Sequence, residues 1–249
     1  MNARKFWRTH AFWPAVGFAL ALSLVAAFDL DRAISHALFF DSASRQWLGG
    51  GEGLWWAHDV IHIGGRWLVG VVTALALIVW LGSFVSRRLR CWRRAAGFAF
   101  LAVALSTGIV GALKSVTNVD CPWDLAEFGG DRPYVTLFAH RPDWLPHTRC
   151  FPGEHSAAGF ALIFGYFLWR DGPRRRARWA LAGGIMLGIA FSIGQEARGA
   201  HFISHDLTSA AIVWFFQLLL YAWTLAPRRH AVPRLIPARA LGDFRAEPR

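Results

Sequence analysis

The chain has 249 residues, of which 55% are hydrophobic and 15% aromatic, with 14 Trp and a formal net charge of +11. Its mean hydropathy of +0.31 excludes an ordinary soluble domain and indicates a polytopic membrane protein. The positive charge alone would suggest a nucleic-acid partner. Most of the basic residues, however, lie at the two ends of the chain and in two short segments between apolar runs. We therefore predict a bilayer contact and no nucleic acid.

Six apolar runs approach the roughly 20 residues that a membrane-spanning helix needs. They lie near 11–28, 67–86, 95–113, 156–170, 178–195 and 207–226. The sequence therefore predicts an all-α, six-transmembrane-helix bundle, with residues 1–249 as one membrane domain that ends in a basic tail at 227–249. We interpret the first run as a retained anchor; the alternative is a signal peptide cleaved after Ala27.

The basic residues predict the orientation of this bundle. Most of the 27 Lys and Arg residues fall within 4–8, 87–94, 170–178 and 228–249, whereas the alternate segments hold most of the acids. Because Lys and Arg accumulate in cytoplasmic loops, both termini are expected in the cytoplasm and the acid-rich segments outside.

The first two outer segments differ in character. Residues 29–66 are expected to be a loop that contains a surface helix at 31–40, with His58 and His62 at the interface or, alternatively, bound to a metal. Residues 115–155 carry five prolines and predict a loop with short helical pieces over the outer mouth of the bundle. An oxidising outer compartment permits a disulfide between Cys121 and Cys150 in this loop.

Three separate outer segments carry ionisable residues, which are costly beside a membrane and therefore functional candidates. Lys114 ends the third run, in a chain whose only other lysine is Lys5. His155 follows a Pro-Gly turn, and Gly153 and Ser156 lie where a helix N-terminus could bind an anion. The last segment, between the final two runs, carries four candidates: Arg198, His201, His205 and Asp206.

This set of side chains suits phosphoryl transfer. Lys and Arg can hold non-bridging oxygens, one histidine can attack phosphorus, and another can protonate the leaving oxygen. A carboxylate can orient the attacking imidazole. The rival reading is a zinc site built from His155, His201, His205 and Asp206, which no second ligand set or His-Glu-x-x-His pattern supports.

The order of these residues resembles the type 2 phosphatidic acid phosphatase superfamily. That family shows lysine, six residues and Arg-Pro; then Pro-Ser-Gly-His; then Ser-Arg, five residues, histidine, three residues and aspartate. Here the first two corresponding stretches begin at Lys114 and at Pro152, and the third runs from Arg198 to Asp206. Gln195 lies six residues before His201, where the family has its arginine, and Arg198 lies three before. The chain is divergent, because Cys121 stands at the first arginine, Gly153-Glu154 replaces Ser-Gly and Gln195 stands at the third-motif arginine.

The resemblance implies the role of each residue. His201 would be the nucleophile, His155 the general acid, and Lys114 and Arg198 phosphate ligands, with no metal or other cofactor. Gly199-Ala200 would leave room for the phosphate beside His201. Asp206 lies five residues after His201 rather than four, so either Asp206 or His205 would orient it. The missing first arginine could be replaced by Arg132, Arg141 or Arg149.

The implied function is a lipid phosphatase of the bacterial inner membrane, with a periplasmic active site and a phosphohistidine intermediate. The implied substrates are undecaprenyl diphosphate, lipid A, phosphatidylglycerophosphate or phosphatidate. One alternative is a lipid phosphotransferase that uses the same intermediate. Another is a non-catalytic lipid-binding or transport protein on the same scaffold. The sequence gives no oligomeric state.

Overall fold

The computed structural model describes residues 3–137 and 139–226, so the basic tail expected at 227–249 lies outside the described residues. Within the described part, five continuous helices are long and apolar enough to cross a membrane. They are Ala3–Ala27, Gly51–Val85, Arg90–Lys114, Arg174–Ala197 and Ile203–Thr224. The chain is thus an all-α membrane protein in its architecture.

These long helices combine regular α-helix with turns of other pitch. Their α-helical parts are α1 (Ala3–Trp7), α2 (Trp13–Ala27), α4 (Gly65–Val85), α5 (Arg93–Lys114), α8 (Arg174–Ala197) and α9 (Ile203–Thr224). Their π-helical turns are Arg8–Phe12 and Trp55–Gly64, and their 3-10 turns are Gly51–Gly53 and Arg90–Trp92.

The second long helix begins well before the apolar run predicted at 67–86. The turn Trp55–Gly64, expected within an outer loop, is helical and continues directly into α4. Ala57, Ile61 and Gly65 recur every four residues, and this face packs on α8. The expectation of a loop up to residue 66 is therefore wrong, and the correction places His62 on a helix.

The fourth predicted run, 156–170, is divided into α6 (Glu154–Ala161) and α7 (Phe164–Trp169). Each helix is shorter than a membrane span, and both pack on α8. The break frees the carbonyl of Ala161, which accepts a hydrogen bond from the buried amide of Gln217 on α9 at 2.8 Å. A polar side chain thus satisfies a backbone group that the break leaves in an apolar interior.

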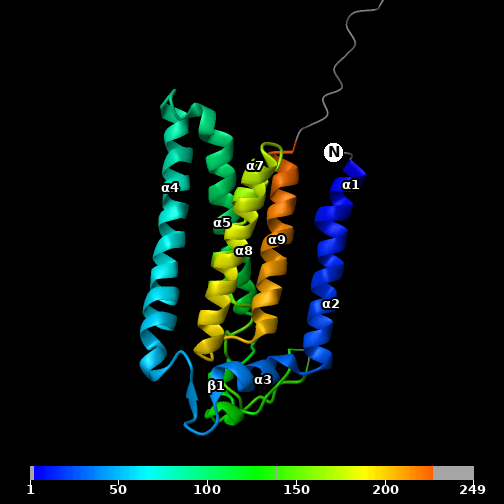
Figure 1. Cartoon of the computed structure of the whole chain (residues 1–249), viewed down its shortest axis with the longest axis vertical. Coiled ribbons are helices and arrows are strands. Elements are labelled where there is room, and N and C mark those ends of the chain that lie inside the picture. The colour runs from blue at the N-terminus through cyan, green and yellow to red at the C-terminus, as the bar shows by residue number, and fades with distance from the viewer. Residues whose placement is uncertain (1–2, 138, 227–249) are drawn as a thin grey trace, which may run out of the picture.

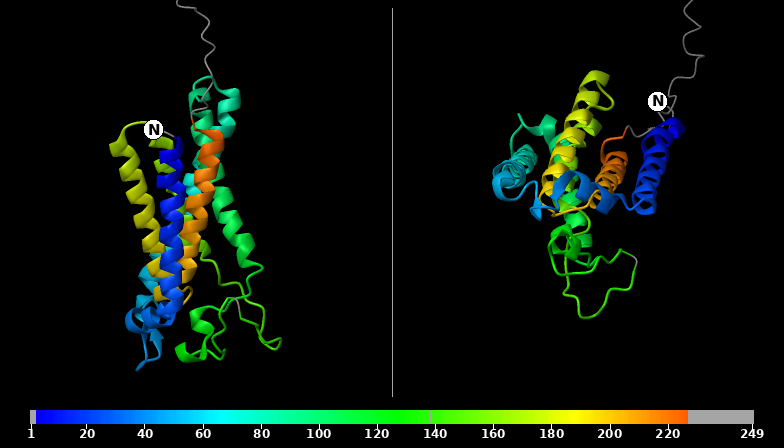
Figure 2. Two further views of the ribbon diagram at one scale, coloured as in Figure 1. Left: turned by 90° about the vertical axis from the view of Figure 1, so that its right-hand side faces the viewer. Right: turned by 60° about the horizontal axis from the view of Figure 1, so that its bottom comes forward.

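The basic turns gather at one end of the bundle. Figure 1 shows the start of α1, the turn between α4 and α5 and the turn between α7 and α8 at the same end. Figure 2 shows the segment between α5 and α6 spreading over the opposite end. In the described part, the charge pattern therefore separates the two ends of the bundle as the sequence predicted.

Short elements cover this second end. They are α3 (Leu30–Ile34) with the π-helical turn Ser35–Phe39, strands β1 (Phe40–Asp41) and β2 (Gln46–Trp47), and the 3-10 turns Pro122–Asp124 and Ala126–Phe128. The strands pair antiparallel, with Phe40 opposite Trp47. Phe40, Leu125, Phe128 and Phe202 form a small buried cluster. This cluster ties the hairpin and the long outer loop to the start of α9.

Candidate functional site

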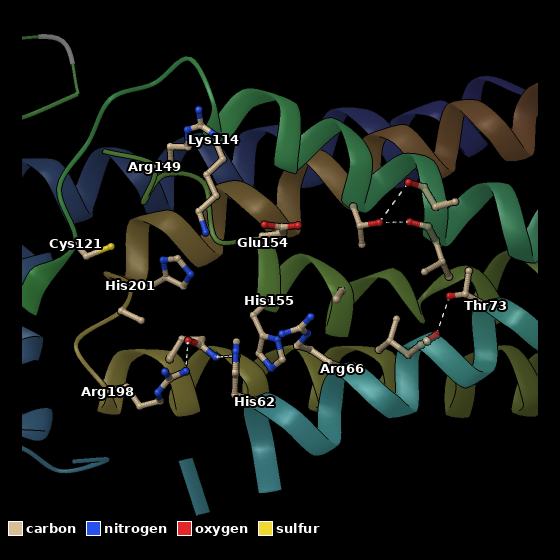
Figure 3. A pocket seen from close by; sticks show the side chains of 18 of the residues that line it. His62, Arg66, Thr73, Lys114, Cys121, Arg149, Glu154, His155, Arg198 and His201 are labelled. Carbon is tan, nitrogen blue, oxygen red and sulfur yellow. Dashed lines mark hydrogen bonds between the residues drawn. The ribbon is translucent and has the colours of Figure 1, made fainter. Parts of the chain in front are cut away.

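A cavity of about 890 Å³ lies between α4, α5, α6 and the turn that joins α8 to α9. Its polar part is lined by His62, Arg66, Lys114, Arg149, Glu154, His155, Gln195, Arg198 and His201. Its apolar part continues between α4 and α5, along Val69, Ala74, Leu77, Phe100, Val103 and Ala104. Figure 3 shows Lys114 and Arg198 on opposite sides of His201 at the polar end. The cavity is therefore polar at one end and apolar along the rest of its length.

The turn after α8 presents Arg198 and His201 to this cavity. Gly199 has a φ of 71°, the left-handed conformation with which helices commonly end. A side chain at this position would also collide with the ring of Trp47. The glycine is therefore required by the turn and by the close approach of Trp47, rather than by room for a phosphate.

His201 is only 4% exposed and lines the cavity. Its Nδ1 atom lies 3.8 Å from Sγ of Cys150, and Nε2 has no hydrogen-bond partner among the described residues. Burial, reinforced by neighbouring His205 and Lys114, lowers the pKa of His201 well below its ordinary value. The imidazole is therefore neutral at neutral pH, and a neutral imidazole carries the lone pair that nucleophilic attack requires.

His205 and Asp206 are both buried but do not line the cavity. The rings of His201 and His205 pack edge to face with centroids 5.7 Å apart. Nδ1 of His205 and both carboxylate oxygens of Asp206 are buried without a hydrogen-bond partner in the described part. Within that part, His201 Nδ1 has the Cys150 sulfur beside it and no carboxylate, so an orienting role for Asp206 or His205 stays a prediction.

Gly153 and Ser156 lie at the N-terminus of α6, as the sequence predicted. Neither lines the cavity, and Ser156 donates a hydrogen bond to the Gly153 carbonyl at 2.9 Å. Ser209 of α9 donates to the same carbonyl at 2.8 Å, and the Gly153 N–H donates to the His205 carbonyl at 3.2 Å. These groups join the start of α6 to α9, so no contact supports the expectation that they bind phosphate.

His155, the second residue of α6, lies in the cavity wall. Its ring stacks on Phe191 with centroids 4.4 Å apart, and its Nε2 lies 3.2 Å from the carbonyl oxygen of Ile61. A carbonyl only accepts, so Nε2 carries the proton of this hydrogen bond. Nδ1 is then the nitrogen that can serve a ligand.

Arg198 begins a hydrogen-bonded chain that the sequence did not reveal. Its Nη1 donates to Oε1 of Gln195 at 3.1 Å, and Nε2 of Gln195 lies 2.9 Å from Nδ1 of His62. Gln195, which replaces the family's third-motif arginine, thus links Arg198 to the helical turn that precedes α4. The sequence singled out His62 only together with His58, as interfacial or metal-bound. Its four-residue spacing to Arg66 could not be used, because this helix was predicted to be a loop.

A disulfide joins Cys121 to Cys150, with Cα atoms 5.2 Å apart. Cys121 lines the cavity at the position of the missing first-motif arginine, and Arg149 lines the same cavity. Because Arg149 directly precedes the bridged Cys150, the disulfide holds this arginine near the vacated position.

The other two candidate arginines, Arg132 and Arg141, bind an acidic residue outside the cavity. Asp120, which is 4% exposed, accepts hydrogen bonds from Arg132 at 2.8 Å and from Arg141 at 2.5 Å and 2.9 Å. Neither arginine lines the cavity. Of the three alternatives left open by the sequence, Arg149 is the one whose position suits a phosphate ligand.

A possible metal-binding group in the described part consists of Cys150, His201 and His205, whose donor atoms lie within 4.8 Å of one another. Cys150 is disulfide-bonded and therefore has no thiolate to offer. This group also differs from the zinc set considered from the sequence, because it lacks His155 and Asp206. Two neighbouring histidines remain, which is fewer than the three protein ligands of typical catalytic zinc sites.

Among protein families, the model of the PAP2 superfamily matches residues 95–229. This region runs from α5 past the end of α9 and contains Lys114, His155 and His201. His62 and Arg66 lie before it. No curated protein and no solved structure matches the chain.

Proposed function

The chain belongs to the PAP2 superfamily, which gives it a phosphatase-type function, and from this premise we propose that it hydrolyses the phosphate of a membrane lipid. The observation that carries the proposal is the cavity, because it joins a cluster of cations to an apolar groove. Along α5 this groove extends from Lys114 to Phe100, about 20 Å at the rise of an α-helix. A lipid phosphate has the same arrangement of an anionic head and a long apolar chain.

The proposed reaction starts at His201. Its Nε2 attacks phosphorus, the bond from phosphorus to the leaving oxygen breaks, and the electron pair of that bond stays on the leaving oxygen. Lys114, Arg149 and Arg198 hold the non-bridging oxygens and stabilise the charge of the transition state. Water then attacks the phosphohistidine, releasing phosphate and regenerating His201.

His155 would protonate an alkoxide leaving group. Burial, reinforced by His62, lowers the pKa of His155 to about 4, so the imidazolium form is expected only once the phosphate anion is bound. Nε2–H then keeps the hydrogen bond to Ile61 while Nδ1–H donates to the leaving oxygen. Its position beside the cavity and its fixed ring support this assignment. No step of this mechanism requires a metal, in keeping with the family resemblance.

We place the site on the periplasmic face of the bacterial inner membrane, with both termini in the cytoplasm. Two observations support this side. The basic turns lie at the end of the bundle opposite the long outer loop. The site also contains a disulfide, and disulfides persist in oxidising compartments rather than in the cytosol.

Phosphate release by the purified full chain tests the function. The substrates are phosphatidate, phosphatidylglycerophosphate, lipid A and a prenyl diphosphate, all presented in detergent micelles. Release from at least one of them, lost in His201→Ala, supports the proposal. Phosphate that appears on an added acceptor lipid, with no free phosphate released, would make the protein a phosphotransferase. Binding without any turnover would make it a lipid-binding protein.

A further inference from the structure

Two basic side chains line the cavity outside the region that matches the family. His62 and Arg66 are four residues apart on the continuous helix that includes α4, so they lie on the same face of it. Figure 3 shows them beside His155, across the cavity from Lys114. Arg66 is exposed to the cavity and has no ion pair within the described part of the chain. An unpaired arginine in a membrane helix is costly and calls for an anionic ligand.

The hydrogen bonds around His62 determine which of its ring nitrogens carries the proton. Arg198 can only donate, so the Gln195 oxygen faces Arg198 and the Gln195 amide nitrogen faces His62. That nitrogen donates to Nδ1 of His62, which leaves the imidazole proton on Nε2. His62 therefore presents a hydrogen-bond donor, and no described residue hydrogen-bonds its Nε2. A donor beside an arginine suits a phosphate oxygen.

The charges of the cavity exceed what one phosphate needs. Its lining contains the cations Arg66, Lys114, Arg149 and Arg198, and Glu154 is its one acid. A terminal phosphate carries a charge of about −1.5 to −2 at neutral pH. A second, bridging phosphoryl group adds another negative charge and so matches the remaining excess of positive charge.

We propose that His62 and Arg66 form a second phosphate subsite and that the preferred substrate is a lipid diphosphate. This inference rests on the proposed function and names the substrate class of the same site. His201 attacks the terminal phosphorus, and the bond to the bridging oxygen breaks. The electron pair stays on that oxygen, which becomes a terminal oxygen of the lipid monophosphate. Arg66 and His62 stabilise the charge that this leaving group acquires.

A matched pair of substrates tests the proposal. Farnesyl diphosphate and farnesyl monophosphate share one hydrocarbon chain and differ only in the second phosphate. The wild-type protein should favour the diphosphate in kcat/KM. Arg66→Gln and His62→Gln should each reduce the ratio of the two kcat/KM values by about tenfold, the scale of one lost charge-assisted hydrogen bond. Arg87→Gln removes an exposed arginine in the turn after α4, far from the cavity, and serves as the control.

Two outcomes would overturn the subsite: a ratio in Arg66→Gln equal to that of the wild type, or no wild-type preference for the diphosphate. If neither substrate is hydrolysed, the proposed function fails, but the subsite is still decided by binding. Inorganic pyrophosphate should then raise the melting temperature of the full chain more than inorganic phosphate does, and Arg66→Gln should remove this difference. Equal shifts by both anions in the wild type would refute the subsite.

Discussion

Cys121 and Cys150 are disulfide-bonded, and the residue before Cys150 is the arginine that lines the cavity beside them. The bond has two consequences. It closes the outer loop over the site, and it sets where Arg149 stands. In this chain a covalent link therefore occupies the position at which the family carries an arginine.

We expect Cys121→Ser to lower phosphate release by about tenfold or more, because Arg149 is no longer held at the reacting phosphate. Arg149→Ala should cause a similar loss while the disulfide stays intact. The measurement is kcat/KM on the best lipid substrate, with free thiols counted in parallel. Cys91→Ser is the matched control, since Cys91 is an exposed free cysteine at the other end of the bundle. Full activity in Cys121→Ser would show that Arg149 needs no disulfide.

Lys114→Ala and Arg198→Ala should each reduce kcat/KM by about a hundredfold, the scale for one lost stabiliser of transition-state charge. Folding should survive, because both side chains face a polar cavity, and the elution profile in detergent checks this. Gln195→Ala should cause a smaller loss, since Gln195 acts by orienting Arg198 and His62. An active Arg198→Ala beside an inactive Gln195→Ala would mean that the third motif has been aligned wrongly.

His201→Ala should abolish both turnover and the phosphoenzyme, because His201 is the proposed nucleophile and its Nε2 has no hydrogen-bond partner among the described residues. Rapid quenching with a labelled substrate and peptide mapping identify the modified residue. His205→Ala should retain part of the activity, since His205 lies behind the cavity lining. His155→Ala should slow monophosphates more than diphosphates, because a phosphate leaving group needs no proton. Label on His155 or His205 would overturn the assignment.

The ion pairs of Asp120 predict a dependence of stability on acid. Burial opposes ionisation of this carboxyl, but hydrogen bonds from Arg141 and Arg132 outweigh it and lower its pKa. A carboxyl whose pKa is lower in the folded state stabilises the fold above its unfolded pKa of about 3.9. That contribution is lost as the pH falls below this value.

Asp120→Asn should therefore lower the free energy of unfolding by about 3 kcal/mol at neutral pH, at the low end for breaking a buried pair because Arg132 is partly exposed. Thermal unfolding in detergent at pH 7 and pH 3 measures the effect, and the difference between variant and wild type should shrink at pH 3. Asp131→Asn, at an exposed neighbouring position, is the control. An equal difference at both pH values would contradict the ionic origin.

Topology is predicted by the placement of Lys and Arg. Reporter fusions after residue 90 and after residue 140 should report the cytoplasm and the periplasm, respectively. The first point lies in the basic turn between α4 and α5, and the second lies in the long outer loop. Reports from the same side would refute the topology and the proposed face of the active site.

The sequence by itself determined the membrane class, the grouping of charges at two ends and the family. All three follow from local properties of the chain. The apolar runs are long enough to be recognised as membrane spans, and Lys114, His155 and His201 each keep their place in a family motif. The amphipathic segment before β1 was also predicted, because its helical periodicity is complete within ten residues.

The tertiary structure decided what depends on contacts between distant segments. His62 lines the site because its stretch is a helix that packs on α8, although residues 29–66 were predicted to be an outer loop. Arg149 could be chosen over Arg132 and Arg141 only because the structure shows that the latter two bind the buried Asp120. The Gly153 backbone is hydrogen-bonded to α9, and Ser156 donates to the Gly153 carbonyl. Each of these depends on which partner lies nearby in space, and spacing along one chain does not encode that.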